Sequence, residues 1–167
     1  MNTNGVLKTI AYEPEKQNGL SHNYIKSIFK DRKGSVWIGS YYGGIDFWDV
    51  SNTNFINYKE SSGKHRLGHK VIRSIVNDVK GNLYFGTEGG GITVLDKQGK
   101  APRYINTSKT DILQSDNIKS LFIDDNLLWA GTFNGGVEIF NIESNRFETN
   151  ILSTELDDIL NAIGVYT

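Results

Sequence analysis

The 167-residue chain contains no cysteine and only two prolines. The lack of cysteine excludes a disulfide scaffold and thiolate metal sites, although it fits a reducing cytosol and a cysteine-poor periplasm equally well. No apolar run approaches the roughly 20 residues that span a bilayer, and Met1–Asn4 lacks the charged and apolar regions of a signal peptide. We therefore expect this segment to make no membrane contact.

An excess of charge of one sign is also missing. The 18 basic and 19 acidic residues are mixed along the chain and give a formal charge of -1, so no basic stripe can neutralise phosphates. Nucleic acid is therefore not an expected partner. The chain is instead rich in glycine, with 18 residues, and it has eight tyrosines, eight phenylalanines and three tryptophans. This composition is typical of many short strands joined by tight turns, and it predicts an all-β protein.

One sequence pattern occurs three times. A strand-like segment with a central serine is followed by an apolar segment that ends in glycine, and then by a pair of glycines. The serines are Ser27, Ser74 and Ser120, the closing glycines are Gly39, Gly86 and Gly131, and the pairs are Gly43–Gly44, Gly90–Gly91 and Gly135–Gly136. Successive serines are 47 and 46 positions apart, and successive closing glycines are 47 and 45 apart. A period of this length with several strands inside it indicates a four-stranded propeller blade.

The turns inside each repeat can be assigned as well. In the first repeat we expect strands at residues 24–30, 35–40, 44–50 and 54–59. Asp31–Gly34 and Asp78–Gly81 have the sequence of hairpin turns in which glycine supplies a positive φ. The third repeat shortens this turn to Asp124–Asn126, where Asn126 is the expected left-handed residue. We interpret the paired glycines as structural, because a Cβ would clash where blades converge.

Strands such as Val36-Trp37-Ile38 carry apolar residues on both faces, as a sheet covered on both sides requires. Trp37 and Trp129 hold equivalent positions and are expected to be buried between neighbouring blades. The sequence thus predicts an all-β, incomplete propeller of four-stranded antiparallel blades, with three full blades and a partial blade at each end. The predicted units are residues 1–19 (outer strand of a preceding blade plus linker), 20–64, 65–112 and 113–154 (the full blades), and 155–167 (the start of a further blade).

Both ends of the chain repeat parts of the unit. Gly5–Tyr12 corresponds to the outer strand of a blade, and Asp158–Ile163 corresponds to a first strand. A short helix is the alternative for the C-terminal segment, because aliphatic residues there also have helical spacing. Three blades are fewer than the about four that close a propeller. We therefore expect the isolated chain to self-associate, either by stacking of an uncovered blade face that includes Phe29, Val36 and Ile38 or by edge pairing of the outer strand Val6–Tyr12.

The segment from Leu20 to Ser40, followed by Gly43-Gly44-Ile45, resembles the two-component regulator propeller repeat. Three copies cover about residues 20 to 152. The second copy has Tyr84-Phe85 in place of the usual Trp-Ile, and the third lacks the turn glycine. The resemblance implies part of the periplasmic sensor region of a bacterial hybrid two-component protein. It further implies that this segment is not an enzyme, that the histidine kinase lies elsewhere in the parent chain, and that the sensed ligand is a glycan fragment.

In a propeller, the linkers between blades and the turns that join second to third strands emerge on the same face. Aromatic rings on that face can stack on sugars, while amide and carboxylate groups bind hydroxyls. The candidate ligand-binding residues are Tyr41, Tyr42, Glu88, Phe133, Asn134, His22 and Asn23, and Lys70 and Asp116 lie on the same predicted face. The turn aspartates Asp31, Asp78, Asp124 and Asp125 are expected on the opposite face, where turn chemistry explains them.

Two other functions stay open, namely a propeller enzyme of streptogramin-lyase-like type and a protein-interaction propeller. An enzyme would need an acid or base that breaks the repeat in the central channel, but the inner strands carry Lys26, Arg73 and Lys119 at equivalent positions. We therefore predict no catalytic residue and no cofactor. A metal site is not expected either, since His65 and His69 are set in a loop rather than on a helix.

Overall fold

The computed structural model describes residues 9–16, 18–49, 51, 55–60, 66–108 and 113–148. Their regular structure consists of strands, which form three four-stranded antiparallel sheets, each with its strands in chain order. The first sheet, blade 1, contains β1 (Ile25–Lys30), β2 (Val36–Ser40), β3 (Ile45–Trp48) and β4 (Phe55–Tyr58). Blade 2 contains β5 (Ile72–Asn77), β6 (Leu83–Thr87), β7 (Ile92–Leu95) and β8 (Arg103–Ile105). Blade 3 contains β9 (Ile118–Asp124), β10 (Leu127–Thr132), β11 (Gly136–Asn141) and β12 (Arg146–Phe147).

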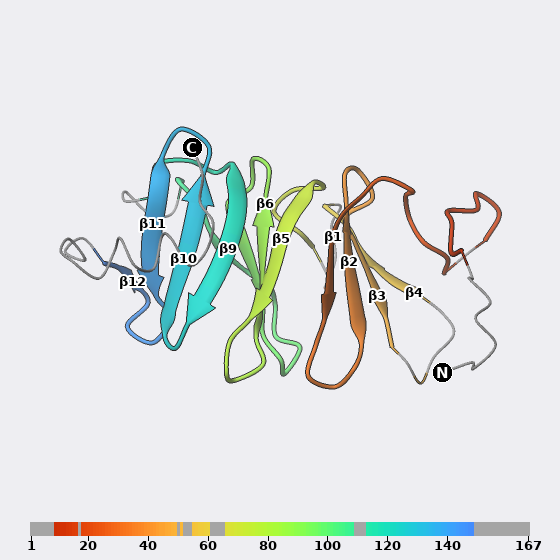
Figure 1. Cartoon of the computed structure of the whole chain (residues 1–167), viewed down its shortest axis with the longest axis horizontal. Helices are drawn as coiled ribbons and strands as arrows, with labels where there is room; N and C mark the ends of the chain where they lie inside the picture. Colours follow the sequence, from red (N-terminus) through yellow and green to blue (C-terminus); the bar gives the residue numbers. More distant parts are fainter. Residues whose placement is uncertain are drawn as a thin grey trace.

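The blades lie side by side along the long axis of the molecule, in chain order (Figure 1). Their first strands approach one another, since β1 packs beside β5 and β5 packs beside β9. This arrangement confirms the predicted all-β fold of consecutive propeller blades that do not close a ring. Among the described residues, no helical segment has the length and apolar character needed to cross a bilayer.

The repeated serines and glycines mark where neighbouring blades come closest. Ser27 is paired with Gly39 across β1 and β2, and the same serine–glycine pair recurs in blades 2 and 3. A Cβ on Gly39 would lie 2.8 Å from Cγ2 of Ile72 in blade 2, and one on Gly86 would lie 2.8 Å from Cγ2 of Ile118 in blade 3. No larger residue fits there without moving the blades apart, which explains why the pattern repeats.

Two hydrophobic cores fill the spaces between the blades. The core between blades 1 and 2 includes Trp37 and Phe85, and the core between blades 2 and 3 includes Tyr84, Leu128 and Ala130. Trp37 is only 7% exposed, which confirms its predicted burial between blades. The equivalent Trp129 is 3% exposed. Because side chains alternate along a strand, Trp129 lies on the face of blade 3 opposite to Leu128 and Ala130, and so faces away from blade 2.

The expected uncovered face needs one correction. Phe29 is paired with Trp37 and packs against the core between blades 1 and 2, so its assignment to the uncovered face of blade 1 was wrong. The alternation along β1 places its neighbour Ile28 on that face instead, and Ile28 is 69% exposed. Ile28 is paired with Ile38, so these two residues share the uncovered face.

The hairpin turns agree with the sequence in two blades and differ in the third. Gly34 and Gly81 have φ values of 88° and 87°, as predicted. In blade 3 the positive φ of 49° belongs to Asp125 and not to Asn126. Asp124 is paired directly with Leu127, so the loop has only two residues, and the first of them takes the left-handed conformation.

The predicted strand near the N-terminus was wrong where the structure describes it. Residues 9–13 form no strand, and the amide of Tyr12 donates to the side-chain oxygen of Asn23 (2.7 Å) instead of to a neighbouring strand. The rest of that prediction, residues 1–8, and the C-terminal unit, residues 155–167, lie outside the described residues.

Candidate functional site

Each first strand has a β-bulge at the same position. The register shifts between residues 25 and 27 of β1, between 72 and 74 of β5, and between 118 and 120 of β9. The extra residue is a cation in every blade, namely Lys26, Arg73 and Lys119. A bulge turns its extra side chain out of the regular alternation. The three cations consequently reach the turns that join second to third strands, where their contacts lie.

Glu88 is held between two of these cations. Arg73 makes a bidentate contact with it, with Nε and the guanidinium Nη2 at 3.1 and 3.0 Å from the two carboxylate oxygens. Lys119 of blade 3 approaches the same carboxylate at 3.5 Å and places its ammonium 4.9 Å from the ring centre of Phe133. The hydrogen bond from Arg73 lowers the pKa of Glu88, so the carboxylate stays ionised. We call Arg73, Glu88 and Lys119 the Glu88 network.

Four rings gather on blade 1 beside this network. Tyr41 and Tyr42 lie 4.3 Å apart at 78°, and Tyr24 lies 6.1 Å from Tyr41. His22, from the linker that leads into the blade, lies 6.2 Å from Tyr42 in an edge-on arrangement. Lys26 is 4.8 Å from the centre of Tyr41, within the range of a cation–π contact. We call His22, Tyr24, Tyr41 and Tyr42 the aromatic cluster.

The aromatic cluster and the Glu88 network form one continuous surface. Hydrogen bonding with Tyr42 raises the pKa of the Tyr41 phenol, and the negative charge of Glu88 raises it further. Lys70, from the linker into blade 2, lies 5.0 Å from the centre of Tyr42. The surface thus crosses from blade 1 to blade 3 and alternates rings with charged groups.

Five of the seven predicted site residues take part in the contacts of this surface. His22, Tyr41 and Tyr42 come together in the aromatic cluster, and Glu88 and Phe133 are linked through Lys119. The other two predicted residues stand apart from these contacts. Asn23 accepts the amide of Tyr12, and Asn134 is an exposed residue of the β10–β11 turn with a φ of 64°.

Sequence reasoning missed Tyr24 and the three cations as members of this surface. The signal was present, since each repeat places a lysine or arginine directly before the repeated serine of its first strand. What the sequence does not show is the bulge, which decides that this side chain turns to the loop face rather than standing in line with its neighbours.

Each linker that carries the site is fixed by one side chain of the third strand in its own blade. The acceptors are Asp46, Thr93 and Glu138, and the amides they bind are those of Ser21, Gly68 and Gln114, at 3.0, 3.0 and 2.7 Å. Ser21 also donates its hydroxyl to Asp46 at 2.9 Å. Burial raises the pKa of the Asp46 carboxyl, and it does the same for Glu138. Each linker is thus fixed to its own blade by an equivalent hydrogen bond.

The histidines in the linkers have a local structural role. Nδ1 of His22 accepts the amide of Tyr24 (2.9 Å), and Nδ1 of His69 accepts the amide of Val71 (3.2 Å). This engagement of one ring nitrogen supports the interpretation that they shape the linkers. His65 lies outside the described residues.

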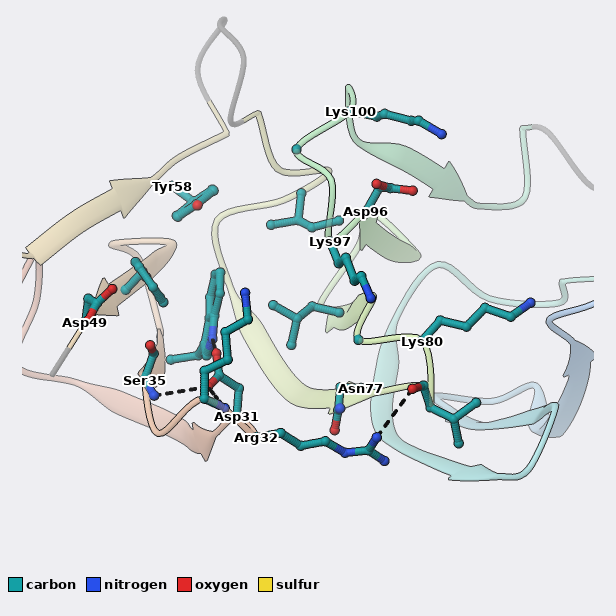
Figure 2. A pocket seen from close by; sticks show the side chains of 18 residues that line it. Asp31, Arg32, Ser35, Asp49, Tyr58, Asn77, Lys80, Asp96, Lys97 and Lys100 are labelled. Atoms are coloured by element: carbon teal, nitrogen blue, oxygen red, sulfur yellow. Dashed lines mark hydrogen bonds between the residues drawn. The ribbon is translucent and has the colours of Figure 1, made fainter. Parts of the chain in front are cut away.

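The opposite face of the blades contains a cavity of about 680 Å³ between the hairpins of blades 1 and 2. Figure 2 shows its lining residues. The apolar part of the lining consists of Trp37, Phe47, Tyr58, Val79, Leu83 and Leu95, and the charged part of Asp31, Arg32, Lys33, Asp49, Lys80, Asp96, Lys97 and Lys100. The sequence placed the turn aspartates there but gave no sign of a cavity.

Comparison with known proteins assigns the repeat. Residues 19–42 match the family model of the two-component regulator propeller. This segment of the chain matches the two-component regulator propeller repeat, and the same serine and glycine pattern recurs in the next two blades. Over 166 residues it is 41% identical to "Histidine kinase P4" of Formosa agariphila, a match that covers 99% of this chain and 12% of the kinase. The propeller repeats described here therefore span about an eighth of that relative.

Solved structures share the propeller fold. The extracellular domain of the putative hybrid two-component system BT3049 from B. thetaiotaomicron superposes with a TM-score of 0.73 at 18% identity, over 82% of this chain and 19% of that one. The extracellular domain of BT4673, a putative hybrid two-component system of the same organism, gives 0.69 at 23% identity, over 84% and 20%. At these identities the likeness establishes the fold of the propeller repeats.

Proposed function

We propose that the chain is part of the extracytoplasmic sensor propeller of a two-component signalling protein, located in the periplasm, and that it binds glycan fragments on its loop face. The propeller repeats, the histidine kinase relative and the extracellular neighbours support the signalling part of this proposal. The kinase activity would then lie in other segments of the parent protein. Those segments would be the partners of this propeller.

The observation that carries the ligand part is the aromatic cluster. Its rings include two with wide exposure, Tyr24 at 64% and Tyr42 at 53%. Exposed rings offer flat apolar surfaces to the C–H faces of a sugar, while the adjacent Glu88 and Lys70 supply hydrogen-bonding groups for hydroxyls. Rings and polar groups alternate over a surface that crosses several blades, which suits an extended ligand.

The carboxylate of Glu88 is poorly suited to acid–base catalysis, because Arg73 keeps it ionised and anchored by two hydrogen bonds. A general acid or base works best when its pKa lies near the working pH. The geometry therefore favours binding over the enzyme alternative.

Titration of the ¹⁵N-labelled chain with neutral oligosaccharides tests the proposal. We expect amide shifts at His22, Tyr24 and Tyr42, and Tyr42→Ala should weaken binding by roughly 2- to 12-fold, the value of one lost ring contact. Phe122→Ala is the matched control, because Phe122 is an exposed ring of β9 outside the aromatic cluster (41% exposed). Equal losses in both variants, or no shifts in the aromatic cluster with any sugar, would contradict the proposal.

A further inference from the structure

The cavity between blades 1 and 2 shares no residue with the aromatic cluster or the Glu88 network. It has an unbalanced charge, since five cations and three aspartates line it. Its volume of about 680 Å³ lies within the range of sites for small molecules, about 300 to 1,000 Å³.

The first aspartate of the lining already accepts three hydrogen bonds. Asp31 accepts the amides of Lys33 (2.9 Å) and Ser35 (3.0 Å) with one oxygen. Its other oxygen accepts the indole N–H of Trp37 at 3.0 Å. This carboxylate keeps its charge, but its hydrogen bonds go to the hairpin and the cavity wall, and in the described part of the chain it forms no ion pair with the cations.

The other two aspartates are used in the same way by their own turns. Asp49 accepts the amide and the hydroxyl of Ser51, at 2.9 and 2.7 Å. These hydrogen bonds lower the pKa of Asp49. Asp96 accepts the amide of Gln98 at 2.7 Å. Both carboxylates serve to close turns at the rim.

None of the cations of the cavity forms an ion pair in the part of the chain that the structure describes. Among the described residues, the acidic partners in ion pairs are Glu13 and Glu88 only, and neither residue lines the cavity. Lys97 is the best placed of the cations. Its stem lies against Gly81, with Cδ 3.4 Å from the position of a Cβ there, and its amide donates to Asn82 (3.2 Å). Figure 2 shows Lys97 lying among the other labelled residues of the lining, whereas the side chains of Lys80 and Lys100 extend away from them.

Flat rings complete the lining. Trp37 packs against Phe47 at 4.4 Å and against Tyr58 at 5.6 Å, centroid to centroid. We propose that this cavity is a second ligand site, which binds a small anionic ligand with a sugar-sized ring. The ring packs on the aromatic wall, and Lys97 with the neighbouring cations binds the anionic group. Because the lining comes from two blades, such a ligand also ties blade 1 to blade 2.

The experiment uses glucose 6-phosphate, glucose and inorganic phosphate as probes, and reads out the indole N–H resonance of Trp37, assigned through Trp37→Phe. That N–H donates to Asp31 in the cavity wall. We expect glucose 6-phosphate to shift the resonance and to bind at least about tenfold more tightly than either of the other probes, since hydrogen bonds to charged groups are worth about 1.5–3 kcal/mol. Added salt should weaken the binding.

Charge reversal tests the assignment to this cavity. Lys97→Glu should abolish the response to glucose 6-phosphate, while Arg146→Glu, an exposed cation of β12 that does not line the cavity, should leave it unchanged. An unaltered denaturant midpoint shows that Lys97→Glu remains folded, and Lys97→Ala serves as the second variant if it does not. Equal binding of glucose and glucose 6-phosphate, or an equal effect of both charge reversals, would overturn the proposal. The glycan proposal is tested independently, because its amide chemical-shift changes are expected in the aromatic cluster.

Discussion

The ring centroid of Trp37 lies 5.9 Å from the ring centroid of Phe85, and the two residues belong to different blades. Trp37 comes from the second strand of blade 1, and Phe85 comes from the second strand of blade 2. The contact is therefore part of the interface that holds one repeat against the next. The stability of the whole arrangement depends on such contacts, because a blade cannot cover its own two faces.

We predict that Trp37→Ala destabilises the chain by about 3–5 kcal/mol, the cost of removing a large buried ring. A urea titration followed by circular dichroism measures the loss. Ile56→Ala is the control, because this side chain on β4 is 45% exposed and should change stability by less than about 0.5 kcal/mol. An unchanged midpoint for Trp37→Ala would show that the interface is not closed in solution.

The two equivalent tryptophans should respond differently to removal of the indole nitrogen. Trp37 donates its N–H to Asp31, but the buried N–H of Trp129 has no acceptor in the described part of the chain. The residue that matches Asp31 is Asp124, which is paired with Leu127 at the end of β9. Trp37→Phe should therefore cost about 1 kcal/mol more than Trp129→Phe. The difference between the two free energies of unfolding is the measurement, and the reverse order would contradict the reasoning.

Asp46 should make the chain more stable as the pH falls through the folded pKa of its carboxyl toward the lower unfolded pKa. Burial raises the pKa of this carboxyl, so the folded chain binds its proton more tightly than the unfolded chain does. The stabilising contribution is present in full below the unfolded pKa and is lost as the pH rises through the folded pKa. Urea titrations of wild type and Asp46→Asn across this range should show that the free energy of unfolding of the wild type rises relative to that of the variant as the pH falls. A constant difference at all pH values would rule out this role.

Glu88 should show the opposite dependence. The hydrogen bond from Arg73 lowers its pKa, so its contribution is present above the unfolded pKa and is lost as the pH falls through the folded one. We expect Glu88→Gln to cost less than about 1 kcal/mol near neutral pH, because the group is partly exposed, and to cost still less at high salt. Thermal melts at low and high salt provide the check, and a loss independent of salt would not fit an ionic network.

We propose that the isolated chain self-associates through the uncovered face of blade 1. Ile28 is 69% exposed there and is paired with Ile38 on the same face, and apolar patches of this kind are usually covered. Light scattering at micromolar concentration should show association in the wild type and a shift toward monomer in Ile28→Lys. A concentration-independent monomer in the wild type would disprove the proposal.

Much of the fold could be read from the sequence, because it depends on local rules that each repeat obeys three times. Gly34 and Gly81 lie where a hairpin needs a positive φ, and the spacing of the serines gives the blade length. The left-handed residue of the third turn was misassigned to Asn126, because the exact loop length depends on the pairing of Asp124 with Leu127.

The site could be predicted only in part. Loop position is a property of the topology, so His22, Tyr41 and Tyr42 could be grouped in advance. The role of Lys26 and its equivalents depends on a bulge, which the amino-acid sequence does not mark. The cavity depends on the space left between two blades, and no property of a single repeat contains that information.

The bonds that fix the linkers also have a consequence for how the chain folds. The partners in these bonds are 25, 25 and 24 positions apart, for Ser21–Asp46, Gly68–Thr93 and Gln114–Glu138. Each bond is thus completed within a single repeat and requires no residue from a distant part of the chain. Folding can begin in any blade and spread to its neighbours, as in other modular arrays. A gene duplication that copies one repeat would copy both the linker amide and the third-strand side chain that accepts its hydrogen bond. Each additional blade would therefore contain both partners of the bond that fixes its linker.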